Sequence, residues 1–259
     1  MKRVAIVQAR TSSSRLPGKV LEPIQGIPMI VFMLRRVVHA TQLDHIILAT
    51  SAEKSDDVLA KQVAHFGFDC FRGDLADVLS RYVAAAEQSG ADIVIRLTGD
   101  CPLIDPDLID ETVSTLIREN VDYASNVNPP TFPKGLDVEA LTRETLLKAH
   151  AEAQLSTDRE HVTPYVRRNK TIFRHANLRS HFDLSGLRWT VDYADDLAFI
   201  RALVDSVDHP DVLLADRFDF LRALDSHYSK MPRNVHECED ERQSEALIIP
   251  AKQSEARKS

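Results

Sequence analysis

Between residue 4 and about residue 120, short apolar runs alternate with longer segments whose apolar residues recur at helical spacing. The apolar runs are predicted to be buried strands, at residues 4–7, 45–50, 68–71 and 92–97. The longer segments are predicted to be helices, at residues 29–40, 55–66, 74–88 and 105–117. Strands that alternate with helices in this way form a parallel sheet with helices on both faces, so the predicted fold class is α/β.

A long polar loop follows the first predicted strand. It carries Arg10, Arg15 and Lys19, four hydroxyl side chains at residues 11–14, and no acidic residue. Ligands of open α/β sheets bind beyond the carboxyl ends of the strands, and clustered cations there suit a polyanion such as a triphosphate. The Walker pattern fits only at Gly18 and Lys19, and the Rossmann glycine pattern is missing. The loop is therefore predicted to bind phosphate in another way, the alternative being a solvated surface loop.

Two aspartates follow predicted strands and are candidate metal ligands. Asp100 ends the fourth predicted strand, at the same edge as the basic loop, and Asp192 lies between a predicted strand at 187–191 and a predicted helix at 194–207. Carboxylate oxygens suit Mg²⁺. The alternatives are structural: Asp100 as a turn residue before a proline, and Asp192 as a helix N-cap in a capping box with Asp195.

The segment 135–141 alternates apolar and acidic residues and is predicted to be a strand that presents Asp137 and Glu139 on one face. These carboxylates are candidates to accept hydrogen bonds from sugar hydroxyls, or they simply lie on an exposed strand face. The proline-rich stretch 126–134 before them is predicted to be a flap-like loop.

Glu160 and His161 are weaker candidates for substrate contact. The four residues that end at Glu160 match a capping box for a helix at 161–168, which Pro164 is expected to kink or shorten. A cap and an ordinary polar side chain therefore explain both residues equally well.

Composition limits the classes of protein that remain. The formal net charge of −7 argues against a protein that coats nucleic acid. The three cysteines show no paired spacing, and no leader or bilayer-spanning run is evident, so we expect a cytoplasmic protein without membrane insertion. The 259 residues fit one catalytic domain over residues 1–228, with a polar, loosely ordered tail at 229–259.

Five motifs, in order along the chain, resemble those of the sugar cytidylyltransferases. That family includes the 3-deoxy-manno-octulosonate and acylneuraminate cytidylyltransferases, and the resemblance is greatest to the branch of spore-coat polysaccharide biosynthesis cytidylyltransferases. The motifs lie at residues 4–19, 97–103, 135–139, 159–165 and 190–197.

The resemblance implies a nucleotide-diphospho-sugar transferase fold, with a mixed, mainly parallel sheet of about seven strands in one domain. It also implies a Mg²⁺-dependent reaction in which a sugar acid attacks the α-phosphorus of CTP in line, giving a CMP-sugar and pyrophosphate for surface polysaccharide or glycoconjugate biosynthesis. Residues 131–170 would form the sugar side of the site, and the protein would be a homodimer.

The resemblance also assigns roles to individual residues. The catalytic set is Arg10, Arg15, Lys19 and Asp100. Nucleotide binding falls to Ala9, Arg10, Ser14, Arg15, Lys19, Arg72, Asp77 and Ser80. The metal ligands are Asp100 and Asp192. The candidate substrate contacts come from the residue patterns above and not from the resemblance: they are Asp137, Glu139, Glu160 and His161.

Three alternatives stay open. The first is a glycosyltransferase that uses a finished nucleotide-sugar, and the second is a nucleotidyltransferase that uses another nucleoside triphosphate or a sugar 1-phosphate. The third is a non-catalytic nucleotide-binding regulator on the same scaffold.

Overall fold

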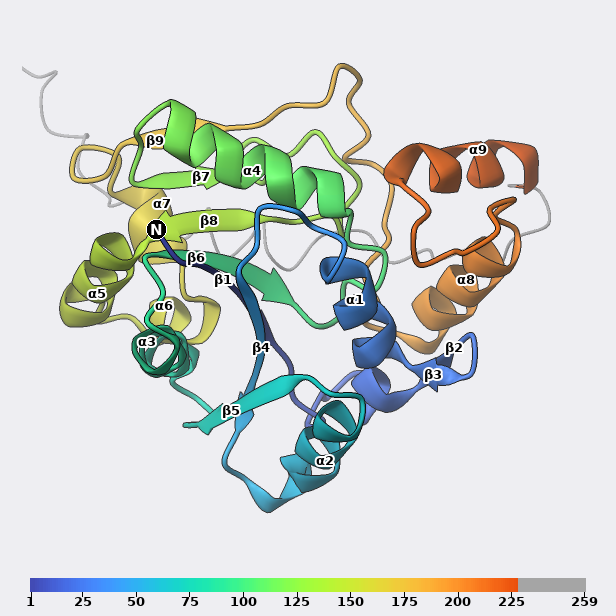
Figure 1. Cartoon of the computed structure of the whole chain (residues 1–259), viewed down its shortest axis with the longest axis horizontal. Coiled ribbons are helices and arrows are strands. Elements are labelled where there is room, and N and C mark those ends of the chain that lie inside the picture. The colour runs from blue at the N-terminus through green and yellow to red at the C-terminus, as the bar shows by residue number, and fades with distance from the viewer. Residues whose placement is uncertain (228–259) are drawn as a thin grey trace, which may run out of the picture.

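A mixed seven-stranded sheet forms the centre of the protein, for which the computed structural model describes residues 1–227 (Figure 1). The strand order is β5-β4-β1-β6-β8-β7-β9. The strands are β1 (Arg3–Gln8), β4 (His45–Ser51), β5 (Asp69–Gly73), β6 (Ile93–Thr98), β7 (Tyr123–Ser125), β8 (Glu139–Thr142) and β9 (His175–Asn177). Of these seven, β8 alone runs antiparallel to its neighbours. The predicted fold class and the mainly parallel sheet are thus confirmed.

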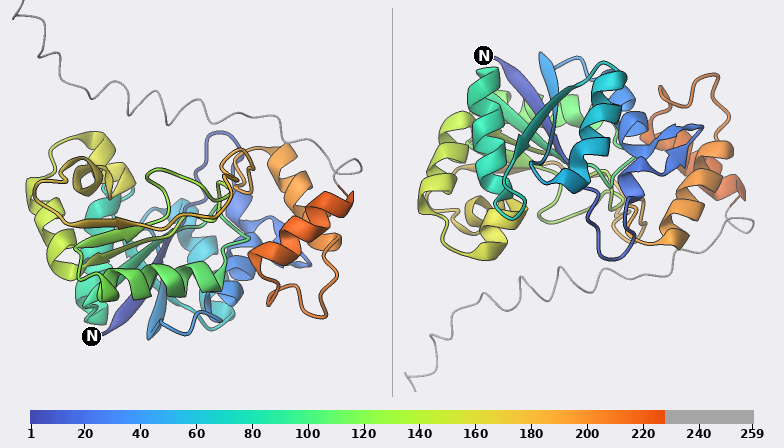
Figure 2. Two further views of the ribbon diagram at one scale, coloured as in Figure 1. Left: turned by 90° about the horizontal axis from the view of Figure 1, so that it is seen from above. Right: turned by 90° about the horizontal axis from the view of Figure 1, so that it is seen from below.

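Helices cover both faces of the sheet (Figures 1 and 2). They are α1 (Met29–Val37), α2 (Asp57–His65), α3 (Val78–Ser89), α4 (Pro106–Arg118), α5 (Arg143–Glu152), α6 (Ser156–His161), α7 (Pro164–Arg168), α8 (Ala194–Asp205) and α9 (Arg217–His227). Two 3₁₀ turns, η1 (Lys19–Leu21) and η2 (Lys54–Asp56), and a small ribbon of β2 (Pro23–Ile24) and β3 (Ile27–Pro28) complete the described elements.

The central strand β1 contributes to two separate cores because its side chains alternate between the faces of the sheet. Ala5 and Val7 pack with α1, α2, α4, α8 and α9, whereas Val4 and Ile6 pack with α3, α5 and α7. All four side chains are fully buried. This burial on both faces explains why the strand reads as an unbroken apolar run.

The elements of the first half follow the predicted order, and their ends have the predicted causes. Gly67 and Gly90 adopt positive φ angles of 84° and 66° just after α2 and α3, a conformation that ends helices. Asp105 caps α4 by accepting a hydrogen bond from the backbone N–H of Asp107 at 2.9 Å, with Pro106 as the first helical residue.

One predicted helix begins later than expected. Residues 74–77 form a turn before α3, because the carboxylate of Asp74 accepts hydrogen bonds from the backbone N–H groups of Ala76 and Asp77 at 2.8 and 2.7 Å. Such local side-chain bonds compete with helical ones. Asp77 is therefore the N-cap of α3, accepting from the N–H of Ser80 at 2.9 Å.

Three predictions for the second half are wrong. Residues 187–191 are not a strand of the sheet: they run beside the loop at 134–136, joined by a hydrogen bond from the N–H of Trp189 to the carbonyl of Lys134 at 2.6 Å. Their apolar character reflects burial, since Trp189 is fully buried. Likewise β8 begins only at Glu139, so residues 135–138 lie in a loop.

The predicted helix at 161–168 is the third. The chain forms two short helices instead, because Val162 has a positive φ of 72° and Pro164 starts a new helix, α7. The expected capping box does not form. The helix α6 begins earlier, at Ser156, and its N-cap residue, Leu155, makes no side-chain hydrogen bond to it.

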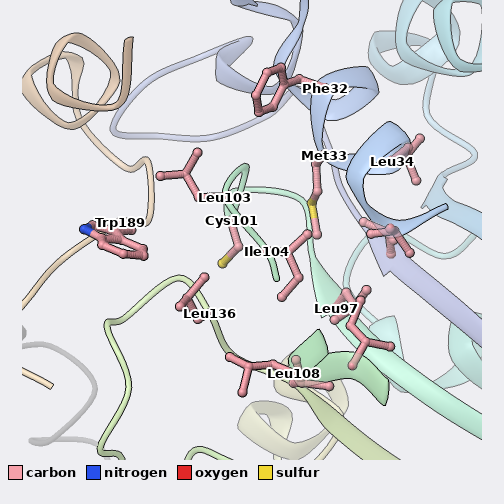
Figure 3. Close-up of a cluster of buried hydrophobic side chains, with 14 of the residues drawn as sticks. Phe32, Met33, Leu34, Leu97, Cys101, Leu103, Ile104, Leu108, Leu136 and Trp189 are labelled. Atoms are coloured by element: carbon pink, nitrogen blue, oxygen red, sulfur yellow. The ribbon is translucent and has the colours of Figure 1, made fainter. Parts of the chain in front are cut away.

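The core extends directly beneath the loops that follow β6 and precede α8. Leu103, Leu136 and Trp189 gather around the buried Cys101 in Figure 3. Cys101 adjoins Asp100, and Trp189 lies three residues before Asp192. Close packing of these apolar side chains thereby fixes the backbone that carries both candidate metal ligands.

Within residues 1–227, none of the helices has the length and apolar character needed to cross a membrane. The predicted tail at 229–259 lies outside the described residues.

Candidate active site

Lys19 lies at the meeting point of three segments at the carboxyl edge of the sheet. It begins η1 after the basic loop, and only 7% of its surface is exposed. Its Nζ lies 3.3 Å from Oδ2 of Asp100, 2.8 Å from Oδ1 of Asp192 and 2.6 Å from the carbonyl oxygen of Val191. Burial opposes the charged form, but the two carboxylates outweigh it and raise the pKa of Lys19 above its usual value.

Asp192 is surrounded by three cations. Besides Lys19, its Oδ1 lies 2.7 Å from Nη2 of Arg15, and its Oδ2 lies 2.8 Å from Nη2 of Arg188. Burial alone would raise the pKa of Asp192, but these cations, Lys19 foremost, hold it well below the usual range. The predicted meeting of the basic loop with Asp100 and Asp192 is therefore present in the structure.

The N-cap of α8 is Tyr193 and not Asp192, and Asp196 is the third residue of the helix. The carboxylate of Asp196 accepts hydrogen bonds from the backbone N–H groups of Asp192 and Tyr193 at 2.8 and 3.0 Å, at the start of α8. The capping-box alternative with Asp195 is thus wrong, because the acceptor is one residue further along. The side chain of Asp192 remains directed at the cations.

Arg188 and Asp196 are site residues that the sequence reasoning missed. Arg188 bonds to both aspartates, with its Nε and Nη2 each 3.1 Å from an oxygen of Asp196. The detectable signal was the spacing of Arg188, Asp192 and Asp196 at intervals of four residues. The three side chains form a network where the chain enters α8.

The basic loop is anchored by a buried carboxylate. Asp56 has no exposed surface and accepts hydrogen bonds from the backbone N–H and the hydroxyl of Thr11 at 2.8 and 2.7 Å. It also bonds to the hydroxyl of Ser51 at the end of β4. The sequence placed Asp56 only within the predicted helix at 55–66, because a contact across 45 residues leaves no local pattern.

The other loop residues predicted to bind nucleotide are Ala9, Arg10 and Ser14, and they differ in exposure. Ala9 is buried and hydrogen-bonds through its N–H to the carbonyl of Ala49 at 3.2 Å, whereas Ser14 is exposed. Arg10 is half-exposed, with its Nη2 3.5 Å from Oε1 of Glu160. The structure therefore brings Glu160, a substrate candidate from α6, next to the loop.

Three further nucleotide candidates make contacts within the protein. Arg72 donates to the carbonyls of Ser51 and Glu53 at 2.9 and 2.8 Å and pairs with Asp57. Asp77 caps α3 and pairs with Arg159, and the hydroxyl of Ser80 donates to the carbonyl of Asp77 at 2.7 Å. Their contact with nucleotide stays a prediction.

Glu139 lies inside the protein and not on an exposed strand face. It is 3% exposed, forms an ion pair with Arg96 on β6 and accepts a hydrogen bond from the hydroxyl of Tyr123 on β7. Burial opposes its ionisation, but Arg96 keeps the pKa of Glu139 below its usual value, and burial together with Glu139 raises that of Tyr123. The prediction of two carboxylates on an exposed face is therefore wrong for Glu139.

Asp137 and His161 complete the predicted set. Asp137 is half-buried in the loop before β8, and His161 is exposed at the end of α6. Neither position conflicts with a role in substrate contact, which stays a prediction for both.

The oxygens of Asp100 and Asp192 provide a donor set that fits Mg²⁺. The side chain of Asp100 is 30% exposed, and both carboxylates converge on the same point, the ammonium of Lys19. No group of three or more His, Cys, Asp or Glu residues suited to a metal occurs within the described residues. Two carboxylates suffice for Mg²⁺, which usually completes its shell with phosphate oxygens and water.

Comparisons with known proteins agree with this arrangement. The profile of the family described as "Cytidylyltransferase" matches residues 4–226. The spore coat polysaccharide biosynthesis protein SpsF of Bacillus subtilis is 32% identical over 224 residues, covering 83% of this chain and 92% of that protein.

Two further relatives bear the same activity in their names. The 3-deoxy-manno-octulosonate cytidylyltransferase of Geobacter sulfurreducens is 35% identical over 118 residues, covering 45% of this chain and 46% of that enzyme. The solved structure of a cytidylyltransferase from Leptospira borgpetersenii superposes with a TM-score of 0.86 at 29% identity, covering 92% of this chain and 99% of that one. The family profile spans most of the chain, including the basic loop, Asp100 and Asp192. This protein is therefore an enzyme of the cytidylyltransferase family.

Proposed function

We propose that this enzyme transfers CMP from CTP to a sugar acid and releases pyrophosphate, with Mg²⁺, in the biosynthesis of a surface polysaccharide or glycoconjugate. The observation that carries the proposal is the convergence of Lys19, Arg15, Asp100 and Asp192 at the carboxyl edge of the sheet. The names of the relatives from Bacillus and Geobacter support the pathway and the class of acceptor.

The cations of the basic loop would hold the triphosphate. Arg10 and Arg15 have half-exposed side chains, so both reach solution, and Arg15 also lies beside Lys19 through their shared partner Asp192. Because pyrophosphate leaves as an anion, positive groups placed beforehand on its side of the site stabilise the transition state. Arg15 and Lys19 would serve this role.

Asp100 and Asp192 would hold Mg²⁺, which when bound neutralises the α-phosphoryl oxygens during displacement. The protein itself has little covalent chemistry to perform, so positioning dominates. Asp56 contributes by fixing Thr11, and Arg188 and Asp196 contribute by fixing Asp192.

The acceptor would approach from the side of α6. Glu160 lies beside Arg10, and Asp137 lies in the loop that leads into β8. Both carboxylates suit hydroxyl groups of a sugar, whose anomeric hydroxyl would attack the α-phosphorus. The buried Glu139 has no part in this contact.

A screen for pyrophosphate release tests the proposal. Each of four nucleoside triphosphates is combined with a panel of sugar acids and sugar phosphates, with and without Mg²⁺. We expect release only with CTP, a sugar acid and Mg²⁺. Release with another nucleotide or with a sugar 1-phosphate would reassign the substrate. Tight binding of CTP without any turnover would favour the non-catalytic regulator, and release of a nucleoside diphosphate from a nucleotide-sugar would favour the glycosyltransferase.

The remaining expectations, a single catalytic domain over residues 1–228, a homodimer and a cytoplasmic location, are part of the proposal and stay predictions.

A further inference from the structure

The ammonium group of Lys19 lies in a cage of three oxygen atoms. Nζ lies 2.6 Å from the carbonyl oxygen of Val191, 2.8 Å from Oδ1 of Asp192 and 3.3 Å from Oδ2 of Asp100. Two of the three oxygens are carboxylate oxygens, the kind that a divalent cation prefers. The same atoms that would ligate a metal are therefore occupied by a cation of the protein itself.

The cage is held in place by contacts that do not involve Lys19. The backbone N–H of Val191 donates to the carbonyl of Asp100 at 2.8 Å, and the hydroxyl of Thr190 lies 3.3 Å from that carbonyl. These bonds tie the segment before α8 to the loop after β6. The backbone positions of Asp100, Val191 and Asp192 therefore do not depend on the ammonium of Lys19.

The two oxygens of Asp192 have different partners. Its Oδ2 is bonded to Nη2 of Arg188, and Arg188 is in turn fixed by the carboxylate of Asp196. The ammonium of Lys19 lies between Oδ1 of Asp192 and Oδ2 of Asp100, so a metal held by both carboxylates through these oxygens would take the place of the ammonium. An ammonium and a divalent cation repel each other strongly at such short range, so they exclude one another from this position.

We propose that the ammonium of Lys19 occupies the metal position in the free enzyme. A divalent cation enters only when a nucleoside triphosphate binds and its phosphate groups become the new partner of the ammonium. The proposal rests on the function proposed above, because it assigns Lys19 and the metal to the same site. Lys19 follows Gly18, which has a positive φ of 74°, and its flexible four-carbon stem allows the ammonium to move from the cage to a phosphate. The device prevents metal from binding tightly without substrate.

The test measures the binding of Mn²⁺ to the full-length protein without nucleotide, by the loss of the free Mn²⁺ signal in electron paramagnetic resonance. Three proteins are compared: wild type, Lys19→Met and Arg15→Met. Lys19→Met empties the cage, whereas Arg15→Met removes the same charge from Oδ1 of Asp192 but leaves the ammonium in place. We expect Lys19→Met to bind Mn²⁺ about 10-fold more tightly than wild type, within the usual range of coupling between sites, and Arg15→Met far less so.

Two results would overturn the proposal. One is Mn²⁺ affinity in Lys19→Met no greater than in wild type. The other is an equal gain in both variants, since a general change in charge would then explain it. Circular dichroism verifies folding, and Lys19→Gln replaces Lys19→Met if the latter does not fold. A ligand that binds only the folded state raises its melting temperature, so Mn²⁺ should stabilise Lys19→Met more than wild type.

The outcome is separable from that of the proposed function. The titration uses no nucleotide and no acceptor, whereas the pyrophosphate screen uses the wild-type enzyme. Tighter Mn²⁺ binding in Lys19→Met, together with an inactive wild type, would leave the shared position intact and remove the proposed reaction. Unchanged Mn²⁺ binding in Lys19→Met, together with an active wild type, would support the proposed reaction and exclude the shared position of Lys19 and the metal.

Discussion

The charged cluster around Asp192 lies at the carboxyl edge of the sheet, and the cluster around Glu139 lies inside the sheet. Glu139 forms an ion pair with Arg96, the residue opposite it in the pairing of β6 with β8, and Arg167 also helps to lower the pKa of Glu139. The side chains of Glu139 and Arg96 are only 3% and 13% exposed. Asp192 instead pairs with three cations, of which Arg15 and Lys19 come from the basic loop and Arg188 from the stretch before α8, and the side chain of Arg15 is 44% exposed.

The difference shows how a structural carboxylate is distinguished from a functional one. A buried pair of opposite charges is complete by itself, and disturbing it leaves a charge without a partner. In the edge cluster three cations contact the single carboxylate of Asp192, and one of them, Arg15, is partly exposed to solution. Such a cluster can exchange partners, which is what binding of a triphosphate and a metal requires.

The largest expected effect lies in the interior cluster. Glu139→Gln leaves Arg96 charged and buried without a counter-charge, so the free energy of unfolding should fall by about 3–5 kcal/mol. Urea denaturation measures the change, with exposed Glu87→Gln on α3 as control, expected within about 0.5 kcal/mol of wild type. The folded fraction of Glu139→Gln should keep its KM for the acceptor. A raised KM with unchanged stability would return Glu139 to the substrate site.

A substitution of Asp100 in the edge cluster should lower activity strongly and change stability little. Asp100→Asn should lower kcat about 10²-fold or more, which corresponds to about 2.7 kcal/mol, while its partly exposed side chain leaves stability nearly unchanged. Pyrophosphate release measures the rate, with exposed Asp208→Asn as the matched control. Lys19→Ala should lose activity to a similar degree. Near-normal turnover by both variants would exclude this edge as the active site.

The dependence of stability on pH gives a third contrast. The folded state lowers the pKa of Asp192 below the unfolded value of about 3.9, so its stabilisation is complete above that pH and disappears as pH falls through the lower, folded value. Asp192→Asn should therefore cost about 1.5–3 kcal/mol at neutral pH, and this cost should shrink below about pH 4.

Urea denaturation of wild type and Asp192→Asn at several pH values between neutral and about pH 3 tests this expectation. Asp225→Asn serves as control, because that carboxylate is exposed on α9. A cost that stays constant with pH would mean that the cations do not interact with the ionised form of Asp192.

The smallest effect should come from substitutions of Asp77. They distinguish a role as helix N-cap from a role in nucleotide binding. Asp77→Ala removes the acceptor for the N–H of Ser80 and should cost about 1 kcal/mol of stability, whereas Asp77→Asn keeps the cap and loses only the pair with Arg159. If Asp77 acts only as a cap, KM for CTP stays unchanged in Asp77→Asn. A rise in KM there, with stability retained, would establish the predicted nucleotide contact.

The alternation of strands and helices and the position of the basic loop could be predicted from the sequence, because both depend on neighbouring residues. Residues 4–7 are apolar since β1 is buried on both faces, and Gly90 and Asp105 mark helix ends through their own conformations and hydrogen bonds. The pairing of Lys19 with Asp100 followed from one general rule, that the carboxyl ends of parallel strands share an edge.

The other charge pairings were decided only by the tertiary structure. Glu139 pairs with Arg96 because β8 runs antiparallel to β6, and a direction of that kind leaves no mark in the alternation of apolar and acidic residues. Asp56 fixes Thr11 across 45 residues, and Arg188 reaches Asp192 where the chain is neither strand nor helix. Local patterns report burial and backbone conformation, whereas the partner of a charge depends on how distant segments pack together, which no local pattern records.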